Sequence, residues 1–221
     1  MVVSVFGLGY VGIVSASCFA RDGINVIGVD VSEAKVDNIN KGVSPIIETG
    51  LSDLLSNGIE NGRIEATTAL DEAIAKSEVS LISVGTPSRE DGALDLSFVN
   101  KVCEDIAAEV SRTKDSHTII IRSTVLPGTT EDIKQRLVSK YPNLKLSIGF
   151  NPEFLREGTA IKDFDEAPYT IIGTEDQQCV EYIKKLYATI DSPVIETKSS
   201  EAELVKYAAN SWLATKIAFA N

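Results

Sequence analysis

The stretch VVSVFGLGYVGIVSASCFARDGINVIGVDVS (residues 2–32) decides the fold of this chain. Its β-branched run VVSVF (2–6) predicts a buried strand, and a helical pattern follows from about Tyr10 to Asp22. NVIGVD (25–30) then predicts a second strand. A strand, a helix and a strand in this order predict a parallel pair with a crossover helix.

Three glycines in the pattern G-x-G-x-x-G, Gly7, Gly9 and Gly12, lie between the first strand and the helix. In such a turn the first glycine allows a tight bend, the second lets a diphosphate approach the backbone, and the third lets the helix pack closely. The free N–H groups and the dipole of the helix N-terminus stabilise the diphosphate. The motif therefore predicts a dinucleotide site, and the alternative is a purely structural glycine turn.

Asp30 ends the second strand, where a carboxylate accepts hydrogen bonds from the adenosine ribose of a bound dinucleotide. The same charge repels a 2′-phosphate, so the sequence favours NAD over NADP as the cofactor. Lys35 follows closely enough to weaken that repulsion, or to contact the ribose or a phosphate itself.

The remainder of the chain alternates short apolar runs with helical patterns. Strands are predicted at 79–85, 118–123, 146–150, 169–173 and 194–197, and helices at about 32–40, 96–111, 129–140 and 176–189, with two short helices between 51 and 76. This order predicts an α/β fold of the Rossmann type, a doubly wound and mostly parallel sheet with helices on both faces.

Composition narrows the possible partners. The net charge of −11 disfavours binding to nucleic acid or to an acidic membrane surface, but a small phosphorylated ligand fits a helix N-terminus. Because no apolar run is long enough to span a bilayer and no signal peptide precedes the first strand, we expect a cytoplasmic protein. The three cysteines, Cys18, Cys103 and Cys179, have no metal or redox spacing and are expected to be reduced. The single histidine, His117, is expected to be structural, and no metal site is predicted.

Polar residues follow three of the predicted strands. Thr86 follows strand 79–85, Thr124 follows strand 118–123, and Glu153 and Glu157 follow strand 146–150. Because ligands of open α/β sheets bind beyond the carboxyl ends of the strands, these side chains are candidate site residues. A glutamate partly removed from solvent can act as a base. The alternative is that they are ordinary turn and cap residues.

The final segment, SSEAELVKYAANSWLATKIAFAN (199–221), predicts a helix that is apolar around most of its circumference. Glu203, Lys206 and Asn210 share one face of it, and a lysine on a buried helix needs a charged partner or a ligand. No capping residue ends this helix, so we expect the chain to be part of a longer protein. The expected division is a dinucleotide-binding domain at 1–198 and the start of a long central helix at 199–221.

Six motifs carry a family resemblance. FGLGYVG, GVDVS, SVGTPS, IRSTVLPGT, NPEFLREGTAIKDF and ELVKYAANSWLATKIAFAN, in this order, resemble the UDP-glucose/GDP-mannose dehydrogenases over essentially the whole chain. Several motifs are more similar to the GDP-mannose 6-dehydrogenase members than to the UDP-glucose ones. The NPEFLREG loop and the KxxxN helix are more specific than the glycine motif.

The resemblance implies NAD-dependent oxidation of the C6 alcohol of a sugar nucleotide, GDP-mannose or UDP-glucose, to the carboxylate. Two hydrides pass to two NAD molecules in turn, a cysteine captures the aldehyde as a thiohemiacetal, and the resulting thioester is hydrolysed. It also implies residues: cofactor contacts at Tyr10, Val11, Asp30, Lys35, Thr86 and Thr124, and sugar contacts at Glu157, Lys206, Asn210 and Asn221, with Glu153 in the active-site loop.

The implied catalytic roles follow the chemistry of these residues. Lys206 and Asn210 can stabilise negative charge on the C6 oxygen, and a glutamate with Thr124 can orient and deprotonate water. The family's central helix implies a homodimer through 199–221.

The family's nucleophilic cysteine lies in a Gly-Ser-Cys loop beyond the residues of this chain, so we expect the chain to bind NAD without completing the oxidation. Two alternatives remain open at this point. One is an NAD-dependent dehydrogenase of the β-hydroxyacid type. The other is a non-catalytic NAD-binding or dimerisation module.

Overall fold

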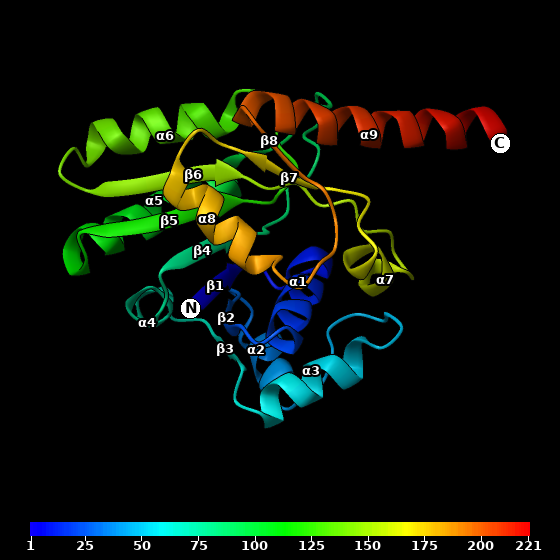
Figure 1. Cartoon of the computed structure of the whole chain (residues 1–221), viewed down its shortest axis with the longest axis horizontal. Helices are drawn as coiled ribbons and strands as arrows, with labels where there is room; N and C mark the ends of the chain where they lie inside the picture. Colours follow the sequence, from blue (N-terminus) through cyan, green and yellow to red (C-terminus); the bar gives the residue numbers. More distant parts are fainter.

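One eight-stranded sheet runs through the molecule and carries helices on both faces (Figure 1). The structure is a computed structural model that describes all residues from Met1 to Asn221. The strands are β1 (Val2–Phe6), β2 (Asn25–Val29), β3 (Ile64–Thr67), β4 (Val79–Ile82), β5 (Ser116–Ile121), β6 (Lys145–Phe150), β7 (Thr170–Gly173) and β8 (Val194–Thr197). The helices are α1 (Tyr10–Arg21), α2 (Glu33–Asn40), α3 (Leu51–Glu60), α4 (Leu70–Lys76), α5 (Ser97–Thr113), α6 (Thr129–Lys140), α7 (Ala160–Asp165), α8 (Gln177–Leu186) and α9 (Ser199–Ala220).

The strand order is β3-β2-β1-β4-β5-β6-β7-β8, and the pairs from β3 to β6 are all parallel. The chain first builds outward from β1 to β3 and then restarts at β4 on the other side of β1. The order therefore reverses between β1 and β4, and in open α/β sheets the ligand crevice lies at such a reversal. The predicted Rossmann-type, doubly wound fold is confirmed.

The last two strands depart from the parallel pattern. β7 pairs antiparallel with β6 through Phe150 and Gly173, and β8 pairs parallel with β7. The segment between β6 and β7 contains only the short helix α7. A strand pair joined without a full crossover helix can be antiparallel. The chain thus turns back at the carboxyl edge of the sheet and leaves a long loop there.

The core consists of two layers of buried apolar side chains, one on each face of the sheet. One layer of 27 residues joins the strands to α1, α2, α3, α7 and α8, and a second layer of 21 residues joins them to α4, α5, α6 and the start of α9. The central strands β1, β4, β5 and β6 are almost entirely buried. The sequence predicted this for β4 and β5, whose apolar stretches do not alternate with polar residues.

Two short elements were missed by the sequence analysis. The region 51–76 contains the two predicted helices, α3 and α4, but the edge strand β3 lies between them. β3 has only four residues and α7 only six, so neither shows a full period of its pattern.

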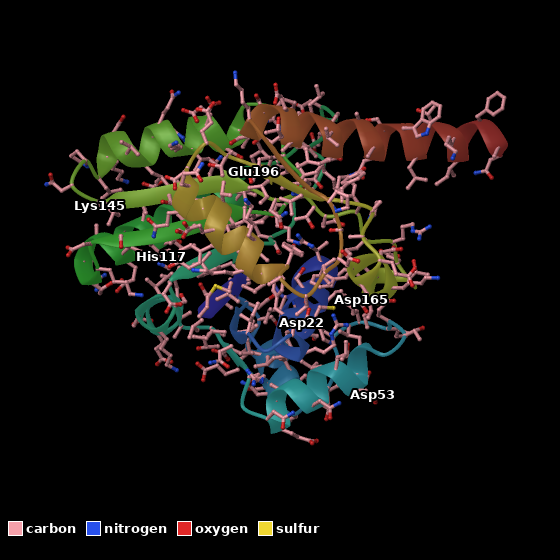
Figure 2. The ribbon with its side chains drawn as sticks, viewed as in Figure 1. Asp22, Asp53, His117, Lys145, Asp165 and Glu196 are labelled. Carbon is pink, nitrogen blue, oxygen red and sulfur yellow. The ribbon has the colours of Figure 1, made fainter.

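The C-terminal part of helix α9 extends beyond the sheet without a neighbouring element (Figure 1). The first turns of α9 pack against β6, β7 and α6, where Ala202, Glu203 and Lys206 are buried. The side chains along its distal half stand clear of the rest of the chain (Figure 2). Among the exposed ones are the apolar side chains of Trp212, Leu213, Ile217 and Phe219. No helix of the structure combines the length and the apolarity that crossing a membrane requires.

A chain of hydroxyl groups crosses the sheet interior and ends on His117 of β5. Ser77 donates to Ser4, Ser4 pairs with Ser80 at 2.8 Å, and Ser80 Oγ lies 2.7 Å from His117 Nε2. His117 is 2% exposed. Burial lowers the pKa of His117 to about 3, with a smaller contribution from the charge of Lys114. The histidine is therefore neutral and structural in this fold, as the sequence predicted.

This burial predicts an acid-sensitive stability. Below about pH 6.5 the unfolded imidazole takes up a proton while the folded one does not, so stability falls as the pH drops toward 3. Between pH 7 and pH 5 the wild type should lose about 2 kcal/mol more unfolding free energy than His117→Gln. Urea unfolding of both proteins across this range measures the difference, and parallel pH profiles would contradict it.

Candidate functional site

The turn after β1 has room for glycine alone at two positions. Gly7 has φ +88°, and a Cβ there would lie 2.9 Å from backbone atoms of Ser83 on the neighbouring strand tip. A Cβ on Gly12 would lie 1.8 Å from the carbonyl oxygen of Gly7. Gly12 therefore lets α1 pack on the turn itself, a closer contact than the helix-to-sheet packing that the motif predicted. The buried hydroxyl of Ser83, beside this turn, has no hydrogen-bond partner.

Gly9 differs from both, because a Cβ at this position would meet nothing within 4 Å. Gly9 is the N-cap of α1 and has no side chain to accept from the first turn. The first intrahelical bond at this end runs from the Ile13 N–H to the Gly9 carbonyl, so the preceding N–H groups face the open space. Open space before free N–H groups is the arrangement that binds an anionic diphosphate.

The carboxylate of Asp30 lies beside this turn. It accepts hydrogen bonds from the N–H of Leu8 at 2.9 Å and of Ser32 at 3.1 Å, and from Lys35 Nζ at 2.7 Å. Burial raises the pKa of Asp30, but these three donors outweigh it and hold the pKa below its usual value. Asp30 is therefore ionised at neutral pH. Lys35 is the ion-pair partner of Asp30 in this structure, which is one of the arrangements that the sequence left open.

The tips of the central strands lie at the same edge as the turn. Phe6 of β1 is in register with Ile82 of β4, which is in register with Ile121 of β5. Thr86 and Thr124 follow these strands and are half-buried. The Ser123 hydroxyl donates to the Val84 carbonyl at 2.6 Å and joins the two tips. The predicted convergence of hydroxyl groups at this edge is thus present.

Glu153 and Lys206 form a buried ion pair between the loop after β6 and helix α9. Lys206 Nζ lies 2.7 Å from Glu153 Oε1, and the two side chains are 5% and 10% exposed. The N–H of Leu155 donates to the other carboxylate oxygen at 2.7 Å, and Lys206 Nζ stands 5.4 Å from the Phe154 ring centroid. The sequence named Glu153 and Lys206 as separate candidate site residues, and the structure places their charged groups together, away from solvent.

The remaining predicted site residues lie apart from this pair. Glu157 is exposed on the loop, and Asn210 is exposed one helical turn beyond Lys206. Asn221 lies at the end of α9, about 22 Å from Lys206 along the helix axis at 1.5 Å per residue. No side-chain hydrogen bond or ion pair joins Glu157, Asn210 or Asn221 to the Glu153–Lys206 pair.

Glu203 does not belong with Lys206, although the sequence placed both on one face of the helix. Its fully buried carboxylate accepts from the N–H of Gly128 at 2.6 Å and of Thr130 at 2.8 Å, and from the Thr130 hydroxyl. Burial raises the pKa of Glu203, and these hydrogen bonds oppose the rise. Glu203 therefore caps the N-terminus of α6 and anchors the start of α9 to that helix.

Two polar residues near the site were not found by the sequence analysis. Glu48, on the loop between α2 and α3, accepts a hydrogen bond from Tyr10 and is buried. Arg122, which follows β5, is 3% exposed and borders a cavity of about 420 Å³ that Glu153 also lines. A charged residue directly after the apolar run TIII was the available signal for Arg122, whereas no local pattern marked Glu48.

The glycine turn, the open N-terminus of α1 and the carboxylate at the tip of β2 together define a dinucleotide-binding domain. Comparison with known proteins names the family. Residues 1–191 match the model of the UDP-glucose/GDP-mannose dehydrogenase family, NAD binding domain. The chain belongs to this family, and its cofactor is NAD.

Individual relatives agree with this assignment. The chain is 48% identical to the GDP-mannose 6-dehydrogenase of Pseudomonas putida and 36% identical to a UDP-glucose 6-dehydrogenase of Haloferax volcanii. Each alignment covers 100% of this chain, but 51% and 53% of the relative. A crystal structure of a ternary complex of GDP-mannose dehydrogenase from Pseudomonas aeruginosa superposes with a TM-score of 0.95 at 45% identity, over 100% of this chain and 52% of that one. The chain spans about half the length of the curated relatives it matches.

The buried pair predicts a large loss of stability when one partner is removed. Lys206→Met leaves the Glu153 carboxylate buried without a cation, and the free energy of unfolding should fall by about 3 kcal/mol. In the double variant with Glu153→Gln, at least half of this loss should return, because no unpaired charge remains. Urea unfolding of the wild type, the two single variants and the double variant measures both effects. A double variant as unstable as the sum of its parents would contradict the pairing.

Proposed function

We propose that this chain is the NAD-binding part of a nucleotide-sugar 6-dehydrogenase that oxidises the C6 alcohol of GDP-mannose or UDP-glucose to the uronic acid. The observation that carries the proposal is the open N-terminus of α1 at Gly9, beside the ionised Asp30, at the point where the strand order reverses. The family match and the relatives supply the class of substrate.

On the cofactor side, different residues bind different parts of the dinucleotide. The backbone from Gly7 to Gly12, including Tyr10 and Val11, holds the diphosphate. Asp30 and Lys35 bind the adenosine ribose, and Thr86 and Thr124 line the cofactor beyond the strand tips. When bound, NAD accepts hydride from the carbon that is oxidised.

On the sugar side, Lys206 and Asn210 stabilise charge on the C6 oxygen, and Glu153 or Glu157 with Thr124 orients and deprotonates water. The ion pair supports this role for Lys206. One N–H of the ammonium group is used by Glu153, and two further N–H donors are left for a ligand oxygen. Glu157 and Asn221 contact the sugar nucleotide.

The relatives favour GDP-mannose over UDP-glucose as the substrate. The six curated GDP-mannose 6-dehydrogenases among the compared relatives are 43–48% identical to this chain, whereas two curated UDP-glucose 6-dehydrogenases and a UDP-glucose dehydrogenase of known structure are 34–39% identical. The difference supports a GDP-mannose enzyme as the parent activity.

The exposed apolar side chains of α9 support a homodimer through this helix. Trp212 is 67% exposed and Phe219 is 93% exposed, on a helix that projects from the sheet. A surface of this kind is stabilised when a second copy covers it.

The NAD site predicts a selective loss of affinity in Asp30→Asn. The amide keeps an acceptor for the Leu8 N–H but loses the charge that favours the ribose hydroxyls, so NAD affinity should fall about tenfold. Asp53→Asn, an exposed carboxylate on α3, is the matched control and should bind as the wild type does. Titration calorimetry with NAD and NADP measures both ligands. Equal affinity of the wild type for NAD and NADP, or an unchanged Asp30→Asn, would refute the assignment of Asp30.

The buried thiols predict that residues 1–221 alone do not sustain the oxidation. Burial raises the pKa of Cys18, Cys103 and Cys179 to about 12, so none supplies a thiolate at neutral pH. With NAD and GDP-mannose or UDP-glucose, no steady-state NADH production is expected from this chain. Continuous NADH fluorescence measures the rate. Sustained NADH production would contradict the prediction and show that the reaction proceeds without a reactive cysteine thiolate.

A further inference from the structure

Glu48 joins two segments that the proposed function uses separately. Its carboxylate, on the loop between α2 and α3, is buried at 8% exposure. On one side it accepts a hydrogen bond from the Tyr10 hydroxyl. On the other side the N–H of Gly158 donates to Oε2 at 2.8 Å and the N–H of Ala160 to Oε1 at 3.1 Å.

The two sides of this clamp, Glu48 with Tyr10, Gly158 and Ala160, belong to different parts of the site. Tyr10 is the first residue of α1 and directly follows Gly9, where the open N–H groups lie. Gly158 and Ala160 follow Glu157 and end the loop that also carries Glu153. The Tyr10 hydroxyl itself lies 3.1 Å from the Arg156 carbonyl oxygen and 3.2 Å from the Gly158 nitrogen.

The protonation states suit the clamp. Burial raises the pKa of Glu48, but the hydrogen bonds from Tyr10, Gly158 and Ala160 outweigh this and lower it. Burial and then the hydrogen bond to Glu48 raise the pKa of Tyr10. At neutral pH a carboxylate therefore faces three donors, and each hydrogen bond is assisted by its charge.

We propose that Glu48 is a positioning residue that couples the dinucleotide turn to the loop 151–159. A diphosphate held at the first turn of α1 fixes Tyr10, and Tyr10 through Glu48 fixes the end of the loop that carries Glu153 and Glu157. Cofactor binding then orders the sugar side of the site. The inference rests on the proposed function and adds that NAD binding controls the order of the loop on the sugar side of the same site.

Only a carboxylate at position 48 serves all three donors. A glutamine has the same shape, but its NH₂ group must replace either Oε1, which faces the Ala160 N–H, or Oε2, which faces the Tyr10 hydroxyl and the Gly158 N–H, so at least one hydrogen bond is lost. Tyr10→Phe removes the single hydroxyl and keeps the ring. It cuts the link to α1 while both backbone N–H bonds to Glu48 remain.

Amide hydrogen exchange with ADP-ribose as the probe tests this coupling. ADP-ribose carries the diphosphate but lacks the nicotinamide, so it does not protect the loop through contacts of the nicotinamide ring. In the wild type it should slow exchange across 7–14, and also slow exchange across 153–160 by about tenfold, the effect expected for one charge-assisted hydrogen bond. In Tyr10→Phe the slowing across 153–160 should disappear, and in Glu48→Gln it should weaken, because the amide cannot serve Oε1 and Oε2 donors together.

Glu181→Gln is the matched control, because it neutralises an exposed carboxylate on α8 that takes no part in the clamp. It should retain both effects. A merely structural Glu48 would change exchange across 153–160 without ligand and leave the increment on ADP-ribose binding intact.

The outcomes separate this inference from the proposed function. If ADP-ribose slows exchange across 7–14 in the wild type, but the loop is unaffected or stays protected in Tyr10→Phe, the coupling is refuted and the NAD site stands. If the wild type shows no slowing across 7–14, the dinucleotide site is refuted and the coupling with it. If Glu48→Gln does not fold, Tyr10→Phe alone tests the coupling.

Discussion

The hydrogen bond from the Leu8 N–H to the Asp30 carboxylate holds the dinucleotide turn in place. It ties the middle of the glycine motif to the tip of the neighbouring strand, so the turn and the acidic side chain form one unit. Lys35 keeps this carboxylate ionised. Gly7 and Gly12 can adopt the turn only because neither has a side chain, and Gly9 leaves the helix N-terminus open. A change in this bond would move both the surface that faces the diphosphate and the group that faces the ribose.

The two sides of the site are built on different physical principles. The cofactor side consists mainly of backbone N–H groups presented by a rigid turn at the reversal of the sheet. The proposed sugar side consists of charged side chains on a loop and on α9, and it keeps its shape through the Glu153–Lys206 pair and the clamp at Glu48. α9 in turn is anchored by Glu203, which caps α6. The loop is thus held directly by α9 and by Glu48, although it contains little regular structure.

Sequence reasoning recovered the parts of this protein that local patterns encode. The strand β1 has a β-branched run, and β4 and β5 have apolar stretches that do not alternate with polar residues. The glycine turn has a fixed spacing, so fold, cofactor class and most strand tips followed. Contacts between distant residues did not follow. Glu48 meets Gly158 across 110 positions, and Lys206 meets Glu153 across 53. Glu203 and Lys206 share a helix face by periodicity, yet Glu203 binds the start of α6 whereas Lys206 binds Glu153 on the loop after β6. Only the packed fold decides such partners.

The most direct test of the diphosphate assignment is a titration of the isotope-labelled chain with NAD, followed by backbone amide NMR. If the turn seats the diphosphate, the amide signals from Leu8 to Gly12 shift most strongly and saturate together with that of Asp30. Strong shifts confined to the cavity beside Arg122, with the glycine turn unchanged, would contradict the assignment.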